Sequence, residues 1–165
     1  MKLEGFAPVG DVDTHTLILG SFPGVASLAV TQYYAHPRNQ FWRLVGAAID
    51  EPLHEMAYED RLKRLVANGI GLWDVIAEAQ RQGSLDSAIR NHSANDLHAL
   101  VSGFPQLHTI AFNGGTAAKI GEKALGDLAR LYRTVRLPSS SAAYAAMPYT
   151  DKLTAWAALR PMQNQ

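Results

Sequence analysis

The sequence contains no cysteine. This absence excludes disulfide bonds, catalysis by a thiolate, and zinc or iron–sulfur sites with cysteine ligands. None of the six histidines belongs to an HExxH motif or a similar ligand pair, so we predict no metal site and no cofactor. The sequence also lacks an apolar run of about eighteen residues and a signal-peptide pattern at its N-terminus. We therefore expect a cytoplasmic protein.

Three common catalytic or nucleotide-binding motifs are missing as well. The sequence has no GxSxG motif, so the serines at 139–141 lack the setting of an α/β-hydrolase nucleophile. It has neither GxxxxGK[ST] nor GxGxxG, which excludes a phosphate-binding loop of that type and a dinucleotide-binding fingerprint. A site with two carboxylates would have to use Asp74 and a partner that the sequence does not identify.

The composition is that of a soluble globular protein, with 47% hydrophobic and 18% charged residues. A length of 165 residues most simply corresponds to one domain, spanning 1–165, that is large enough to bury a core. The formal net charge is zero, but the segment 119–136 carries five basic and two acidic residues. This segment could create a field that attracts phosphate, although an ordinary solvated surface explains it equally well.

Strand-like and helix-like segments alternate along the chain. Short apolar runs predict buried strands at 14–20, 70–76, 107–114 and 132–138. Helical spacing and end signals, including Ser93 and Asp96 as a capping box, predict helices at 38–49, 54–68, 76–83, 93–103, 115–125 and 150–159. This alternation is typical of an α/β fold, in which right-handed crossovers produce a parallel sheet covered by helices on both faces.

Polar or turn-forming residues follow the end of each predicted strand. GSFPG at 20–24 follows the first strand, Asp74 lies at the end of the second, Asn113 ends the third, and the serines at 139–141 follow the fourth. Ligands of parallel α/β sheets bind outside the carboxyl ends of the strands. We therefore expect these four segments to converge on one crevice.

The segment YYAHPRNQFW at 33–42 combines flat rings, amides and a positive charge. Its four aromatic side chains could stack on a planar ligand, a contact worth about 1–3 kcal/mol for each nucleic-acid base. Asn39 and Asn113 each carry a donor and an acceptor, which is the pair needed to read the edge of a base. Arg38 lies near a predicted helix start, where it could hold a phosphate.

Each of these residues also has an ordinary structural role open to it. Phe41 and Trp42 can be core residues of their helix, and Asn39 can do no more than cap it. Asn113 can form a turn with the following glycine, and Asp74 can cap a helix. The residues alone therefore predict an α/β domain with a crevice for a flat, polar ligand.

The order and spacing of several motifs are more specific than any one of them. LILGSFPGVASLAVTQYYAHPRNQFWRL resembles the first motif region of the uracil-DNA glycosylase superfamily. Together with GIGLWDVI, SLDSAIRN, FNGGTAAK and LPSSSAA it is similar to the hypoxanthine-DNA (DNA-deoxyinosine) glycosylase branch of that superfamily. The resemblance covers roughly residues 14–160, nearly the whole chain.

This resemblance implies a three-layer α/β/α sandwich around a four-stranded parallel sheet. It implies a monofunctional enzyme that acts on double-stranded DNA containing a deaminated base, chiefly hypoxanthine, with uracil as a second substrate. Such an enzyme flips the target nucleotide out of the duplex, which costs least for a mispaired base. It then hydrolyses the N-glycosidic bond and leaves an abasic site. We expect a monomer that works at the nucleoid.

The resemblance also implies roles for individual residues. The asparagine of HPRN is Asn39, which matches the catalytic residue of the hypoxanthine branch. The implied base pocket consists of the turn after the first strand, one aromatic residue and two strand ends: Gly20, Ser21, Phe22, Pro23, Gly24, Tyr34, Asp74 and Asn113. The residues implied to contact DNA lie in two loops: His36, Arg38, Pro138, Ser139, Ser140 and Ser141.

Two positions depart from the mismatch-specific uracil branch. That branch has an asparagine in the turn where this sequence has Phe22, and it has a second asparagine where this sequence has Leu137. The amide of Asn39 can instead orient water and donate a hydrogen bond to developing negative charge. Because an amide is no general base, we expect a modest enzyme.

Three alternatives remain open at this point. The first is a uracil- or thymine-mismatch glycosylase, because the positions that select the base are not evident from the sequence. The second is a module of the same fold that binds lesions without catalysis, which Phe22 in the turn favours. The third is an α/β protein that binds small nucleosides, for which little salt-dependent affinity for duplex DNA is expected.

Overall fold

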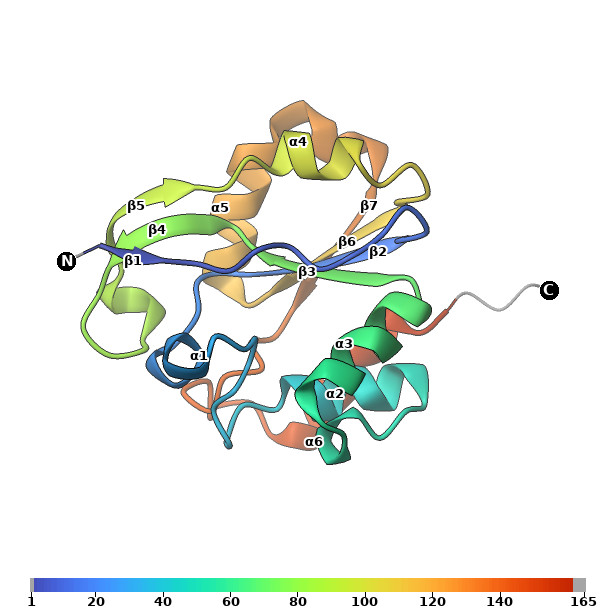
Figure 1. The fold of residues 1–165 in the computed structure, drawn as a ribbon, viewed down its shortest axis with the longest axis horizontal. Coiled ribbons are helices and arrows are strands. Elements are labelled where there is room, and N and C mark those ends of the chain that lie inside the picture. The colour runs from blue at the N-terminus through green and yellow to red at the C-terminus, as the bar shows by residue number, and fades with distance from the viewer. Residues whose placement is uncertain (1, 162–165) are drawn as a thin grey trace.

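The computed structural model describes residues 2–161. Its centre is a sheet of four parallel strands: β2 (Thr16–Gly20), β3 (Ile70–Asp74), β6 (Thr109–Asn113) and β7 (Arg133–Leu137). The strands lie side by side in the order β3-β2-β6-β7 (Figure 1). These are the four strands predicted from the apolar runs. Because all of them are parallel, their carboxyl ends lie at one edge of the sheet.

Helices cover both faces of this sheet (Figure 1). On one face lie α2 (Phe41–Ile49), α3 (Tyr58–Ala67) and α6 (Tyr149–Trp156). On the other face lie α4 (Leu97–Ser102) and α5 (Gly115–Leu125). The expected α/β/α sandwich around a four-stranded parallel sheet is therefore confirmed.

The middle strand β2 shows why the predicted apolar pattern is continuous. Leu17 and Leu19 pack into the core beneath α4 and α5. Ile18 packs into the opposite core with Phe41 and Trp156. Leu17, Ile18 and Leu19 are all fully buried. A parallel strand covered on both faces needs apolar side chains at successive positions, rather than the alternation of a half-exposed strand.

A second, antiparallel sheet has the order β1-β4-β5 and consists of β1 (Leu3–Glu4), β4 (Ile76–Gln80) and β5 (Arg90–Ala94). The predicted helix at 76–83 is therefore wrong. The sequence IAEAQ is rich in good helix formers, but Ile76 and Ala79 are buried while the residues between them are only partly so. Pairing along both edges of β4 outweighs the local helical preference.

The other departures concern helix ends and short elements. The patterns do not predict α1 (Val25–Val30) or the 3-10 helices η2 (Asp86–Ala88) and η3 (Gly126–Leu131). The predicted helices at 54–68 and 150–159 are each divided, because η1 (Leu53–Glu55) precedes α3 and η4 (Ala157–Leu159) follows α6. Only half of the predicted capping box is present. Ser93 lies in β5, and Asp96 alone caps α4, with its Oδ1 accepting from the Ala99 amide at 3.0 Å. No helix within residues 2–161 is long and apolar enough to cross a membrane.

Candidate active site

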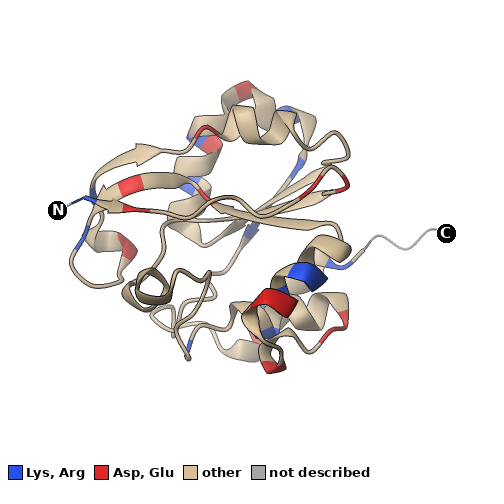
Figure 2. Cartoon of the chain, in the orientation of Figure 1, with Lys and Arg blue, Asp and Glu red and all other residues tan. Residues whose placement is uncertain are grey.

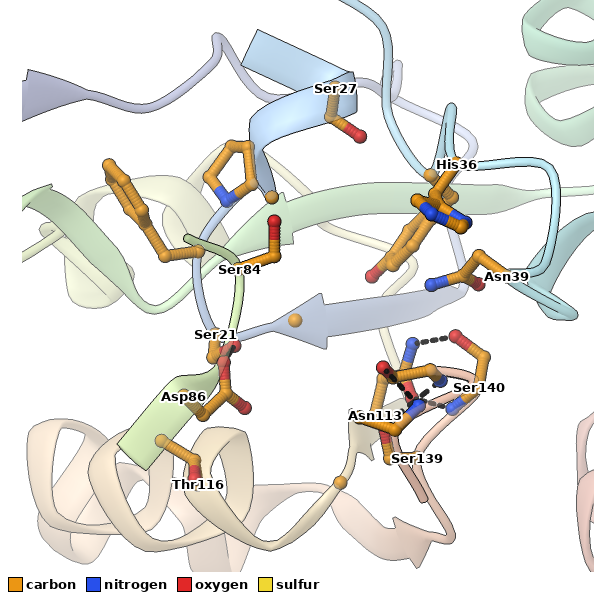
Figure 3. Close-up of a pocket in the computed structure, with 18 of the residues that line it drawn as sticks. Ser21, Ser27, His36, Asn39, Ser84, Asp86, Asn113, Thr116, Ser139 and Ser140 are labelled. Carbon is orange, nitrogen blue, oxygen red and sulfur yellow. Dashed lines mark hydrogen bonds between the residues drawn. The ribbon is translucent and has the colours of Figure 1, made fainter. Parts of the chain in front are cut away.

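A cavity of about 520 Å³ lies at the carboxyl ends of the central strands. Figure 3 shows side chains from segments far apart in the sequence pointing into it. Most of the residues predicted for the site line this cavity: Gly20, Ser21, Phe22, Pro23, Gly24, Tyr34, His36, Asn39, Asp74, Asn113, Ser139, Ser140 and Ser141. Arg38 and Pro138 do not line it. The structure thus brings the four expected strand-end segments to one crevice.

The turn after β2 is joined to the strand beside it by backbone hydrogen bonds. The Val75 amide donates to the Gly20 carbonyl at 2.8 Å, and the Ile76 amide donates to the Ser21 carbonyl at 3.2 Å. The Phe22 ring is buried in the core, with the Arg81 guanidinium 5.4 Å from its centroid. Phe22 therefore contributes to packing. It places an apolar ring at the position where the mismatch-specific uracil branch has an asparagine.

Gly20, Tyr34 and Asp74 meet at the floor of the cavity. Gly20 and Asp74 are register partners at the ends of β2 and β3. A Cβ placed on Gly20 would lie 2.6 Å from both the Tyr34 hydroxyl and Asp74 Oδ1, so only glycine leaves room for these two groups. The Tyr34 hydroxyl and Asp74 Oδ2 are buried and have no hydrogen-bond partner.

Tyr34 is held in an unusual backbone conformation, with φ at 55°. For a residue with a large side chain this left-handed conformation costs about 1–3 kcal/mol. Its ring stacks on Phe41, with 3.8 Å between centroids and 15° between planes. Because Phe41 covers one face of the ring, a bound base can contact only the other face or the ring edge. The predicted stacking aromatic is thus in the site, but it is stacked within the protein.

Burial shifts the pKa of both polar groups at the floor. The pKa of Asp74 is raised to about 7: burial raises it most, the negative charge of Asp86 also raises it, and the positive charge of Arg81 lowers it. Burial also raises the pKa of Tyr34 above its usual range, with a further contribution from the charge of Asp74. The floor can therefore carry a neutral carboxyl beside a neutral phenol at neutral pH.

Asn39 lies just before α2 and makes a local turn with its first residue. Its Oδ1 accepts from the Phe41 amide at 3.0 Å, while the N-cap position itself is Gln40. It also lines the cavity, and Figure 3 shows its amide nitrogen pointing toward the interior. The backbone amide of Asn39 donates in turn to the His36 carbonyl at 2.9 Å. These contacts orient the Asn39 carboxamide: its oxygen accepts a backbone hydrogen bond, and its nitrogen faces the cavity.

Asn113 is committed to the serine loop rather than free to read a base. Its Oδ1 accepts from the Ser140 amide and its Nδ2 donates to Ser140 Oγ, both at 2.9 Å. Ser140 is buried. The Ser140 carbonyl accepts from the Gln40 amide at 3.0 Å, which ties the loop to the start of α2. Asn113 therefore fixes the wall of the cavity at the end of β6.

Comparison with known proteins identifies the family of this chain. The family model for the uracil DNA glycosylase superfamily matches residues 7–160. The chain belongs to the uracil DNA glycosylase superfamily. Two relatives are named hypoxanthine DNA glycosylase. The one from Methanosarcina acetivorans is 48% identical and the one from Methanosarcina barkeri 44% identical, each over 143 residues that make up 87% of this chain and 89% of the relative.

A solved structure of this superfamily has the same fold. The solution NMR structure of a Methanosarcina acetivorans protein, described as a candidate uracil DNA glycosylase, superposes with a TM-score of 0.83. The two chains are 42% identical, and the match covers 96% of this chain and 99% of the other. The resemblance stated from the motifs is therefore confirmed over nearly the full length.

The sequence patterns missed one side of this superfamily site, the connection between β4 and β5. Ser84 Oγ accepts from the Val25 amide at 2.8 Å and so caps α1. Ser21 Oγ donates to Asp86 Oδ1 at 2.7 Å. Arg81 donates through Nη2 to the Pro23 carbonyl, while its Nη1 is buried without a partner. The segment SLDSAIRN was part of the resemblance, but no spacing rule assigns its side chains to the cavity.

The serine loop has a second support in Lys152 on α6. This side chain is buried, its Nζ donates to the Ser141 carbonyl at 3.3 Å, and it lies 5.3 Å from the centroid of the Tyr144 ring. Burial lowers the pKa of Lys152. Ser139 Oγ accepts from the Ser141 amide at 3.1 Å within the loop. These contacts hold the serine loop against α6 as one wall of the cavity.

Charge is distributed without a dominant basic face. Figure 2 shows acidic and basic residues on both helical layers. Within the basic segment 119–136, Arg136 pairs with Glu122 through two hydrogen bonds, and Arg130 lies 3.8 Å from Asp127. The predicted phosphate-attracting field of this segment is therefore partly neutralised. Among residues 2–161, no group of three or more His, Asp or Glu side chains lies close enough to hold a metal ion.

Proposed function

We propose that this protein is a monofunctional DNA glycosylase that releases deaminated bases from double-stranded DNA, chiefly hypoxanthine. The observation that carries this proposal is the position of Asn39, whose amide nitrogen points into a cavity of about 520 Å³. That volume is in the range of small-ligand pockets, roughly 300–1,000 Å³. The names of the two Methanosarcina relatives support the choice of base.

The base must leave the duplex to enter the cavity. Flipping costs a few kcal/mol and least for a mispaired base, so a deaminated base is favoured before it reaches the pocket. In this proposal His36, Arg38 and the serine loop 138–141 contact the DNA backbone, with backbone amides and hydroxyls as donors. Asn113 and Lys152 support this loop from within, which preorganises it for the strand.

In the proposed reaction the bond between the sugar C1′ and the base nitrogen breaks, and the electron pair leaves with the base. A water oxygen adds to C1′ of the oxocarbenium-like sugar and loses a proton to solvent, while the departing base takes up a proton. Asn39 orients that water or donates through Nδ2 to the negative charge that develops on the base. Because the Phe41 amide already holds Oδ1, the nitrogen is fixed in direction before the substrate arrives.

The test is base release from four labelled duplexes that contain hypoxanthine, uracil, a G·T mismatch or no lesion. The proposal predicts release of hypoxanthine by the wild type and a loss of at least about 100-fold with Asn39→Ala, as for removal of one preorganised donor. Gln106→Ala is the matched control, because it removes an exposed amide before β6. Release confined to uracil or thymine would assign the protein to the mismatch branch, and binding without release would overturn the enzymatic proposal.

A further inference from the structure

The buried cation beneath the serine loop has no counterion within the described part of the chain. Lys152 on α6 is only 2% exposed. It takes part in none of the ion pairs found among residues 2–161. Burying a charge without a charged partner is strongly unfavourable, so a buried lysine of this kind needs a physical reason.

The contacts of Lys152 hold its ammonium group in place without neutralising it. Nζ donates to the Ser141 carbonyl at 3.3 Å, which is long for a hydrogen bond of this type. That carbonyl also accepts from the Tyr144 amide at 3.1 Å. The Tyr144 ring, the second partner of Nζ, has its centroid 5.3 Å away. Both partners are neutral, so the positive charge remains behind the loop.

The other side of the same loop is open to an anion. Ser139, Ser141 and Ala142 line the cavity, and Ala142 is exposed. The backbone amides of Ser139 and Ala142 donate no hydrogen bond to any group within residues 2–161. Backbone amides of this kind are common donors to phosphate oxygens. An anion on this side would therefore meet N–H donors in front of it and the charge of Lys152 behind them.

We propose that Lys152 is the counterion of one DNA phosphate, which docks on the serine loop when the target nucleotide enters the cavity. Lys152 is a positioning residue in this proposal, because the loop lies between its charge and the phosphate. The proposal rests on the proposed glycosylase function and deepens it by naming the cation that balances the bound strand. It also gives the reason for the buried charge, since an apolar side chain of similar length would fill the same space without a charge.

The salt dependence of DNA binding tests this role. The probe is a duplex with a tetrahydrofuran analogue of an abasic site, which the full chain can bind without releasing a base. The slope of log K against log[salt] between about 50 mM and about 200 mM counts the phosphates that the protein neutralises, at about 0.9 for each. Lys152→Met should reduce the magnitude of this slope by about 0.9, which corresponds to about eightfold weaker binding at about 100 mM salt.

Lys123→Met is the matched control. Lys123 is exposed near the end of α5, whereas the start of that helix lines the cavity with Gly115 and Thr116. The substitution removes the same charge from the protein, but its salt slope should equal that of the wild type. Urea unfolding accompanies both variants. Because Lys152→Met replaces a buried charge by an apolar chain, its free energy of unfolding should be no lower than that of the wild type.

A second measurement removes the charge from the DNA instead. A neutral methylphosphonate replaces, one at a time, the phosphates on the two sides of the abasic analogue. One of these duplexes should bind the wild type about eightfold more weakly than the unmodified duplex, because one phosphate is no longer neutralised. Lys152→Met should bind the same two duplexes with equal affinity. This comparison uses the wild-type protein as well, so it does not depend on the variant alone.

The possible failures are distinguishable. An unchanged salt slope in Lys152→Met, or an equal reduction in both lysine variants, would overturn the role of Lys152 while the glycosylase proposal stands. The same holds for a methylphosphonate effect of equal size in wild type and Lys152→Met, or for a Lys152→Met protein less stable than the wild type. If the slope and methylphosphonate results were as expected but no hypoxanthine were released, the phosphate contact would stand and the proposed function would be overturned.

Discussion

Asn113 holds Ser140 by two hydrogen bonds of 2.9 Å, one to the backbone amide and one from the carboxamide nitrogen to the hydroxyl. The two residues are 27 positions apart, and both are buried. This pair joins the end of β6 to the loop after β7. It converts a run of three serines into a defined wall of the cavity.

Removing this pair should loosen the wall. Asn113→Ala leaves the buried Ser140 amide without its acceptor, which costs about 1–3 kcal/mol. We therefore expect urea unfolding to show a stability loss of that size, together with weaker binding to lesion-containing duplex DNA. Ser102→Ala is the comparison, because it removes an exposed hydroxyl that bonds within α4. Equal DNA affinity for Asn113→Ala and wild type would contradict a role for the loop in binding.

Gly20→Ala tests the space at the floor of the cavity. The added methyl group would lie 2.6 Å from Tyr34 and Asp74, and Tyr34 is held from behind by its stack on Phe41. We expect the two side chains to be displaced and base release to fall by at least about tenfold, the effect of a barrier raised by about 1.4 kcal/mol. The matched variant Gly103→Ala meets no atom closer than 3.4 Å and lies at the end of α4. If Gly20→Ala released hypoxanthine at the wild-type rate, the floor would not be part of the site.

The buried carboxyl of Asp74 should make the fold less stable at higher pH. Its pKa is raised from 3.8 to about 7 in the folded state, so the unfolded state gives up the proton first. The contribution of Asp74 to the stability of the folded state is therefore most favourable below about pH 4, and it is lost as the pH rises to about 7. Relative to that of the wild type, the free energy of unfolding of Asp74→Asn should rise by about 3 kcal/mol between about pH 5 and about pH 8, because each pKa unit corresponds to about 1.36 kcal/mol. Urea unfolding at these two pH values measures the difference, and a constant difference would contradict it.

The protein should lose stability in acid because of two histidines at the amino ends of β2 and β6, at the edge of the sheet opposite the cavity. His15 and His108 stack at 5.1 Å between centroids, and burial and the charge of His108 lower the pKa of His15. The unfolded state then binds a proton that the folded state resists, so stability should fall as pH drops below about 6.5. His108→Gln removes the repelling charge and should reduce this loss in urea unfolding between about pH 7 and about pH 5. The same loss in both proteins would show that the pair is not responsible.

The sequence predicts the central sheet well because its strands are covered on both faces. A run such as Thr16–Gly20 has no polar side chain at its buried centre, and so short an uninterrupted apolar run favours a buried parallel strand. The antiparallel sheet is less predictable. Its strand β4 consists of residues that also form helices, and only pairing with β1 and β5 decides the outcome. Such pairing joins distant segments and leaves no local periodicity.

The candidate site is likewise predictable from the sequence only in part. Rules for parallel α/β sheets place Asp74 and Asn113 at one edge, and the motif resemblance adds Asn39. No rule of spacing shows that Asn113 is committed to Ser140, because that contact depends on how two loops meet in space. The same holds for the unpaired carboxyl of Asp74, since burial from several segments creates it.

If the amide nitrogen of Asn39 serves base release, Asn39→Asp should abolish most of the activity. Aspartate keeps the oxygen that accepts from the Phe41 amide, but it has no N–H and places a negative charge beside the departing base. The measurement is single-turnover release of hypoxanthine from duplex DNA by wild type and Asn39→Asp, with thermal unfolding of both. We expect an unchanged unfolding temperature and base release reduced by at least about 100-fold. Release by Asn39→Asp at or above the wild-type rate would contradict it.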